Sequence, residues 1–321
     1  MRRALSRIPL DTFLVLLVGV VVLAALVPAR GAAADVLSVA TKAAVALLFA
    51  LYGARLSPQQ AWHGVRQWKL HAMVLATTFL VFPLLGLAAR VLVPAVLTPD
   101  LYTGLLFLCL VPSTVQSSIA FTSIARGHVS AAMVSASLSN LLGVVLTPLL
   151  AVALMPISGT PHVDGSAVLD IVLQLLLPFA VGQALRPWLA PRVARHARLT
   201  HAVDRGSILL IVYAAFSVGM VEHIWSSVQP WRVVAVAAVS AVLLAIVLAV
   251  TAISGRLARL DRGDAIVLLF CGSKKSLASG LPMALVLFPP TSLGLIMLPL
   301  MLFHQLQLFV CAVIASRLAR D

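Results

Sequence analysis

Long apolar segments separated by short polar ones make up nearly the whole chain. Segments of about 20 apolar residues are long enough to cross the hydrocarbon core of a bilayer as helices. We predict about ten such spans. In order they are 10–27, 36–52, 71–92, one that begins near 101, one that begins near 130, 168–185, 208–221, 233–253, 265–288 and 293–315.

Polar residues interrupt two of these spans. The fourth contains the segment Val111–Ser118, and the ninth contains Cys271–Pro282 with the adjacent Lys274 and Lys275. A lysine at the centre of a bilayer costs roughly 2.5 to 3.5 kcal/mol, so this pair is not expected to face lipid. The small residues and Pro282 instead predict a broken helix that lines a cavity.

Composition agrees with a polytopic, all-α membrane protein. Hydrophobic residues make up 61% of the chain, charged residues 10%, and mean hydropathy is +1.08. The basic residues behind the net charge of +13 lie mostly in short loops between spans and form no run with interleaved aromatic residues, which argues against a nucleic-acid-binding surface. The three cysteines lie in apolar segments and form no CxxC pair, so we expect no disulfide, metal site or cofactor.

The distribution of basic residues predicts the topology. With a cytoplasmic N-terminus, 17 of the 23 Lys and Arg residues fall on the cytoplasmic side. This bias predicts an even number of spans in the cytoplasmic membrane, with both termini and a basic central loop, 186–205, in the cytoplasm. The basic start and the small residues at 31–34 also resemble a cleaved secretory signal, although the first span is long for one.

A shift of 160 residues places one interrupted span on the other. It aligns Ser113 with Ser273 and the start of the fifth span with the start of the tenth. Two halves, 1–160 and 161–321, would each hold five spans and would therefore insert with opposite topology. Inverted repeats with broken helices at matching places are a plan of secondary transporters. The alternative is a structural bundle that contains two kinked helices.

Candidate binding residues are the polar groups expected near the two breaks. They are Gln116, Ser117, Ser118, Ser273, Lys274, Lys275 and Ser276 at the breaks, Thr78, Ser135 and Asn140 in neighbouring spans, and His304 in the tenth. Serines in membrane helices often serve only close packing, and His304 could be a hydrogen-bonded structural residue or a proton carrier.

The segments Pro112–Thr122 and Gly272–Pro282 resemble the bile acid/sodium symporter family, and most closely its SBF-like branch. Leu51–Leu56 and His304–Gln307 extend the resemblance over nearly the whole chain. It implies ten helices, divided into a panel domain and a core domain in which the fourth and ninth helices are broken and cross.

The same resemblance reveals departures from sodium-dependent members. Ser273 and Leu277 stand where a glutamate and a glutamine would hold sodium, Ser117–Ser118 lies near a Ser-Asn pair, and Thr78 replaces a further glutamine. The only glutamate in the chain is Glu222, so a hard cation would have no carboxylate ligand among these positions. We therefore predict transport that does not require sodium.

Positive charge without an internal counter-ion remains at the second break. Either one lysine is uncharged, or an anionic substrate completes the pair. We predict a secondary transporter of an organic anion, embedded in the lipid bilayer and not an enzyme. Three alternatives stay open: lysines that only tie half-helix carbonyls together, a membrane regulator of ion homeostasis that transports nothing, and a Ser-Lys intramembrane hydrolase.

Overall fold

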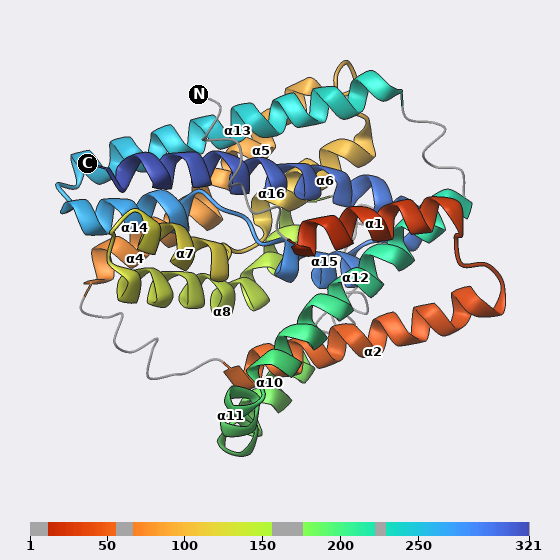
Figure 1. Cartoon of the computed structure of the whole chain (residues 1–321). Helices are drawn as coiled ribbons and strands as arrows, with labels where there is room; N and C mark the ends of the chain where they lie inside the picture. Colours follow the sequence, from red (N-terminus) through yellow and green to blue (C-terminus); the bar gives the residue numbers. More distant parts are fainter. Residues whose placement is uncertain (1–11, 56–66, 156–175, 222–228, 321) are drawn as a thin grey trace.

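A computed structural model of the chain describes residues 12–55, 67–155, 176–221 and 229–320 (Figure 1). Every regular element in these ranges is helical. The elements are α1 Thr12–Leu26, α2 Ala32–Arg55, α4 Trp68–Ala76, the π-helix η3 Thr77–Val81, α5 Phe82–Ala88, the 3-10 helix η4 Ala89–Leu92, α6 Pro99–Leu110, α7 Gln116–Ile124, α8 Val129–Leu154, α10 Leu177–Ala184, α11 Arg186–Arg195, α12 Ala197–Val221, α13 Pro230–Leu257, α14 Arg262–Gly272, α15 Leu277–Leu287 and α16 Pro290–Leu318.

The described helices form two groups that lie side by side (Figure 1). The first, which we call the side layer, consists of α1, α2, α10 and α12, with α1 packed on α12 and α2 packed on α10. A Cβ atom on Gly53 or Gly182 would collide with a carbonyl oxygen of the opposite helix, so α2 and α10 touch through their backbones. The second group, the crossover bundle, contains α4 to α8 and α13 to α16.

Both predicted helix breaks are present in the crossover bundle. The helix α6 ends at Leu110 because Pro112 has no N–H and disfavours helical geometry at Val111, which is extended. Four residues, 273–276, separate α14 from α15, and the side chain of Ser276 accepts a hydrogen bond from the Ser279 N–H at 3.1 Å. That serine caps the new helix.

Six helices of the described ranges are long and apolar enough to cross a membrane. They are Ala32–Arg55, Trp68–Leu92, Val129–Leu154, Arg198–Val221, Pro230–Leu257 and Pro290–Leu318. The other four predicted spans correspond to the 15-residue α1, the two broken helices, and α10, whose predicted start lies outside the described residues. The ten-helix inverted repeat therefore stays a prediction.

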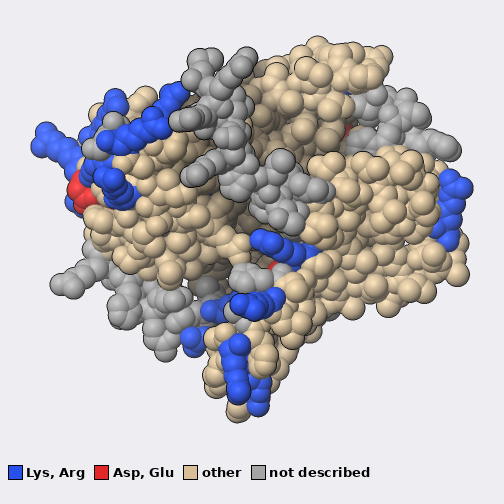
Figure 2. Space-filling model, viewed as in Figure 1, with Lys and Arg blue, Asp and Glu red and all other residues tan. Residues whose placement is uncertain are grey.

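One predicted loop is helical. Residues 186–205 form α11 and the first turns of α12, where the sequence suggested an irregular basic connection. Arginine, leucine and alanine are strong helix formers, and Pro187 near the start of α11 suits a first turn. On the face shown in Figure 2, Lys and Arg side chains gather at one end of the crossover bundle and over α11, while most of the other described surface is uncharged.

Candidate substrate site at the helix breaks

The two helix breaks are bonded directly to each other. The Ser276 N–H donates to the Pro112 carbonyl at 2.8 Å, and the Ser113 hydroxyl donates to the Cys271 carbonyl at 2.6 Å. The Ser118 hydroxyl also donates to the Phe270 carbonyl, at 3.2 Å. Carbonyls at a helix C-terminus have no partner within the helix, so these hydroxyls satisfy the end of α14.

Lys275 performs the same task at the end of α6, with a full charge. Its Nζ donates to the carbonyls of Thr78 at 2.9 Å, Cys109 at 2.8 Å and Val111 at 2.8 Å. An ammonium has three protons to donate, so all three are used. The group is fully buried and also lies 4.1 Å from the ring centroid of Phe82. These are the contacts expected if Lys275 ties half-helix carbonyls together.

Lys274 has a different environment. It is equally buried, but its Nζ has no hydrogen-bond partner among the described residues. The nitrogen instead lies 4.0 Å from the ring centroid of Phe121 and 5.3 Å from that of Phe270. A cation-π contact attracts a desolvated ammonium but leaves its donors unused.

Gln307 fixes the backbone between the two breaks. Its side-chain oxygen accepts from the Lys275 N–H, and its Nε2 donates to the Lys275 carbonyl, both at 2.8 Å. The same Nε2 lies 2.9 Å from Nδ1 of His304. Gln307 belongs to the segment His304–Gln307 that extends the family resemblance, but it is not among the site residues predicted from the sequence.

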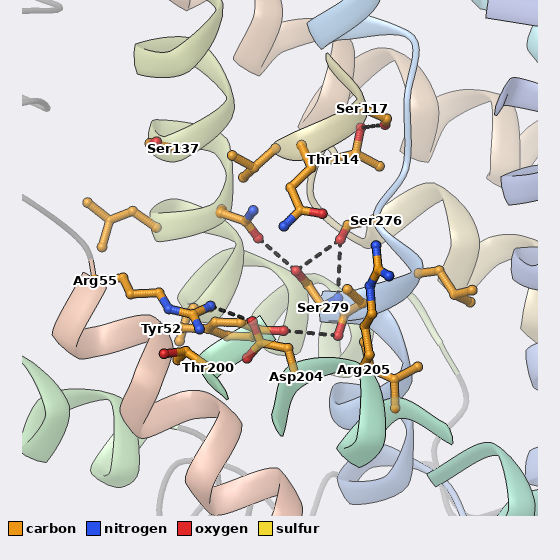
Figure 3. Close-up of a pocket in the computed structure, with 18 of the residues that line it drawn as sticks. Tyr52, Arg55, Thr114, Ser117, Ser137, Thr200, Asp204, Arg205, Ser276 and Ser279 are labelled. Atoms are coloured by element: carbon orange, nitrogen blue, oxygen red, sulfur yellow. Dashed lines mark hydrogen bonds and ion pairs between the residues drawn. The ribbon is translucent and has the colours of Figure 1, made fainter. Parts of the chain in front are cut away.

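A cavity of about 820 Å³ lies between the side layer and the crossover bundle. Its floor is formed by the starts of α7 and α15, directly after the two breaks (Figure 3). Helix starts carry partial positive charge and unpaired N–H groups, which favour an anionic group. Apolar side chains such as Val144, Phe179 and Ile208 line its walls.

Five of the eleven predicted site residues line this cavity: Gln116, Ser117, Asn140, Ser276 and His304. The Asn140 side-chain oxygen accepts a hydrogen bond from Ser279 at 2.8 Å, which joins α8 to the second break. The other six, Thr78, Ser118, Ser135, Ser273, Lys274 and Lys275, are buried outside the cavity lining. Ser135, for example, is bonded to His71 Nδ1 at 2.7 Å.

The charged groups that line the cavity come from the side layer and α11. They are Arg55, Arg186, Asp204 and Arg205, and Arg55 forms an ion pair with Asp204 at 2.6 Å. From the sequence these arginines were assigned only to the topology, because basic residues near span ends are typical of cytoplasmic loops. Aspartate in the same segment was the available signal that this region does more than orient the chain.

The geometry argues against the Ser-Lys hydrolase. The Lys275 ammonium is engaged by three carbonyls, and the Ser276 hydroxyl is bonded to Ser279 at 3.0 Å. The Ser273 hydroxyl donates to the Leu269 carbonyl of its own helix. A catalytic dyad needs the amine within hydrogen-bond reach of the hydroxyl, and no such contact occurs among the described residues.

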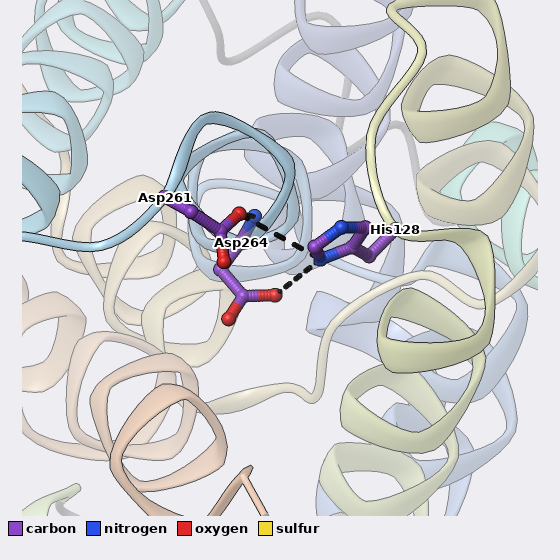
Figure 4. A group of neighbouring side chains, drawn as sticks. All are labelled: His128, Asp261 and Asp264. Carbon is purple, nitrogen blue, oxygen red and sulfur yellow. Dashed lines mark hydrogen bonds and ion pairs between the residues drawn. The ribbon is translucent and has the colours of Figure 1, made fainter.

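A second polar cluster joins the outer ends of the broken helices (Figure 4). His128 Nδ1 lies 2.8 Å from an Asp264 oxygen and 3.7 Å from an Asp261 oxygen. The hydrogen bond with Asp264 raises the pKa of His128 above its usual 6.5, because the carboxylate favours the protonated ring. His128 follows α7 and the aspartates begin α14, so this cluster ties the two halves of the sequence together.

Paired helix breaks that meet under a cavity are a plan of membrane transporters. The chain belongs to the SBF-like CPA transporter family, whose model matches residues 11–320. This confirms the family resemblance read from the two interrupted segments.

Relatives match along almost their whole length. An uncharacterized protein of Pseudomonas aeruginosa is 48% identical over 311 residues, which cover 97% of this chain and 93% of the relative. YfeH of Escherichia coli, named a candidate symporter, is 47% identical, with 97% and 94% covered. Sodium/bile acid cotransporter 7 of Danio rerio is 26% identical, again with 97% and 94% covered.

Proposed function

We propose that this protein is a secondary transporter that carries an organic anion and that binds it in the cavity between the side layer and the crossover bundle. The observation that carries the proposal is the lining of this cavity. Three arginines and one aspartate line it, and two helix starts form its floor. An organic acid with an apolar body would place its charge on the positive groups and its body on the apolar walls.

The packing of the side layer supports the proposed inverted repeat. A shift of 160 residues moves α1 onto residues 172–186, which include α10, and moves α2 onto 192–215, most of which belong to α12. The observed pairs, α1 with α12 and α2 with α10, are therefore exchanged by the repeat. We propose that the side layer is the panel domain and the crossover bundle the core domain of a carrier. Reporter fusions should place both termini and residues 186–205 in the cytoplasm, and an external 186–205 segment would contradict this topology.

Sodium independence is supported by the contacts of Lys275. In transporters with broken helices, half-helix C-termini and unwound carbonyls coordinate the coupling cation. At the end of α6 these carbonyls hold an ammonium from the protein itself. A sodium ion about 4 Å from it would be repelled by roughly 4 kcal/mol at an effective dielectric near 20, about a thousandfold in affinity. We propose that Lys275 replaces a transported cation, so that uptake follows a proton gradient, exchange or facilitated diffusion.

Uptake by purified protein in liposomes tests both parts. We expect accumulation of a labelled organic acid that is unchanged when choline replaces sodium at fixed pH and membrane potential. A steep, saturable loss of uptake in choline would refute sodium independence. If no acid in a broad panel is taken up although the protein is folded, the carrier proposal fails and the regulator alternative gains.

A further inference from the structure

The charged side of the cavity has two polar atoms without a partner. Arg186 Nε and Asp204 Oδ1 are both buried, and neither forms a hydrogen bond with any described residue. Both belong to charged side chains that line the cavity. Buried polar atoms in folded proteins almost always have a hydrogen-bond partner. An unsatisfied donor and an unsatisfied acceptor on two side chains that line one cavity therefore point to a polar ligand that binds in this cavity.

These two unsatisfied atoms require different partners. Arg186 Nε is a donor and needs an acceptor, whereas Asp204 Oδ1 is an acceptor and needs a donor. The Arg55 guanidinium donates to the other oxygen of Asp204 at 2.6 Å, which holds the carboxylate in place, while Oδ1 has no hydrogen-bond partner among the described residues. Figure 3 shows Arg55 and Asp204 on one side of the cavity and Arg205 extending from α12 toward the start of α15.

Charge decides which group the arginines receive. Arg55, Arg186 and Arg205 outnumber Asp204 among the described lining residues, so an acidic group is favoured even after the ion pair is counted. Guanidinium groups match carboxylate, sulfonate and phosphate oxygens in geometry as well as charge. The single carboxylate then serves a neutral or positive donor on the same ligand.

We infer that Arg186 and Arg205 bind the acidic group of the transported molecule, while Asp204, held by Arg55, accepts a hydrogen bond from a hydroxyl or N–H group that the same molecule carries. The inference rests on the proposed function and narrows its substrate class to organic acids that bear a hydrogen-bond donor. Dodecanoate-like acids without a donor leave Asp204 Oδ1 unsatisfied, and uncharged alcohols leave the arginines unsatisfied.

Thermal unfolding of the purified protein in a maltoside detergent tests the inference with four probe acids. Cholate and 12-hydroxydodecanoate carry hydroxyl groups, and 5β-cholanate and dodecanoate are their counterparts without hydroxyls. The methyl ester of each acid controls for partition into detergent. We expect at least one hydroxylated acid to stabilise the protein. Its counterpart without hydroxyls should need about tenfold higher concentration for half-maximal stabilisation, and its methyl ester should not stabilise the protein. Failure of all four acids to stabilise the wild type would overturn the site.

Two substitutions separate the roles. Arg186→Gln should lower the affinity for every acid that binds by about tenfold, because the positive charge attracts the acidic group of each of them. Arg186→Lys should restore part of this affinity. Asp204→Asn places an amide where Oδ1 lies and removes a negative charge. It should therefore lower the affinity for the hydroxylated acid and leave the affinity for its counterpart without hydroxyls unchanged or higher. Equal effects of Asp204→Asn on both acids would contradict the donor assignment.

Matched controls use charges outside the cavity lining. Arg192 is also on α11 but is exposed and bonded to the Trp188 carbonyl, and Asp35 lies at the other end of α2. Arg192→Gln and Asp35→Asn should leave all half-saturation values unchanged. Uptake assays then distinguish the two proposals: acids that bind without uptake would refute transport alone. If Arg186→Gln and Asp204→Asn leave the uptake of an acid unchanged, the proposed binding site alone is refuted.

Discussion

The ends of α6 and α14 present the same physical problem with two solutions. Both helices stop inside the crossover bundle, and both leave carbonyls without a partner within the helix. At α14 the neutral hydroxyls of Ser113 and Ser118 donate to these carbonyls, while at α6 the Lys275 ammonium donates to two carbonyls of that end and to Thr78. A hydroxyl satisfies a carbonyl at little electrostatic cost. An ammonium also brings a fixed positive charge to the position where related architectures bind a cation, which is why the two ends are expected to respond differently to mutation.

Loss of Lys275 should have the largest effect. Lys275→Ala leaves three buried carbonyls without a donor, and we expect a loss of at least about 3 kcal/mol of stability, since each unsatisfied buried acceptor costs about 1 to 3 kcal/mol. Sodium or methylammonium should restore part of it, because either cation can enter the vacated carbonyl cage. Thermal unfolding of the purified variant in sodium, methylammonium and choline measures both effects. The exposed Lys69→Ala is the control, and a Lys275→Ala protein as stable as the wild type would remove the basis for a built-in cation.

The neutral end should be less sensitive. Ser113→Ala removes the 2.6 Å hydrogen bond to Cys271 and should reduce stability by about 1 to 3 kcal/mol, with no response to added sodium. Ser137, which lines the cavity, provides a matched serine whose replacement by alanine should change stability by less than about 0.5 kcal/mol. A sodium response in Ser113→Ala would erase the distinction between the two ends.

Lys274 sharpens the comparison because it is a buried charge without a hydrogen-bond partner among the described residues. Lys274→Met removes the buried charge together with its cation-π contacts, but it leaves an apolar side chain of nearly the same length that can pack on the rings of Phe121 and Phe270. Stability should therefore be unchanged or higher by about 1 kcal/mol. We expect liposome uptake to fall at least tenfold in the same variant, which corresponds to about 1.4 kcal/mol. The reason is that we assign a role in transport to a buried charge that does not stabilise the fold. Normal uptake by Lys274→Met would assign the residue to packing.

The contact between His128, which follows α7, and Asp264 of α14 should give the smallest effect on stability, and this effect should depend on pH. Hydrogen bonding to Asp264 raises the pKa of His128, so its contribution is present below the ordinary value of 6.5 and disappears as pH rises through the raised value. The pair is about half exposed at His128, which limits the contribution to less than about 1 kcal/mol. Unfolding of wild type and His128→Gln should differ at about pH 6 and converge in alkaline buffer. A difference that grows with pH would refute the assignment.

Local sequence determined the class of protein and the places where its helices break. Apolar segments of span length, Pro112 after α6, and the small residues with two lysines after α14 each act through neighbouring residues, because helix formation and helix interruption are decided over a few positions. The same features carried the family resemblance. Five of the eleven predicted site residues line the cavity for this reason, since they lie at or beside the breaks or on helices that face them.

Tertiary structure decided what each of those residues contacts. The acceptors of Lys275 lie 164 to 197 positions away in the chain, so no local pattern distinguishes it from Lys274. The nitrogen of Lys274 lies over the rings of Phe121 and Phe270 and has no hydrogen-bond partner among the described residues. The carbonyl of Thr78 belongs to a π-helical turn, which the sequence does not signal. The arginines of the cavity became a candidate site only when α2, α11 and α12 brought them beside Asp204. A charge acquires its role from the partners that the fold supplies, and those partners are remote in sequence.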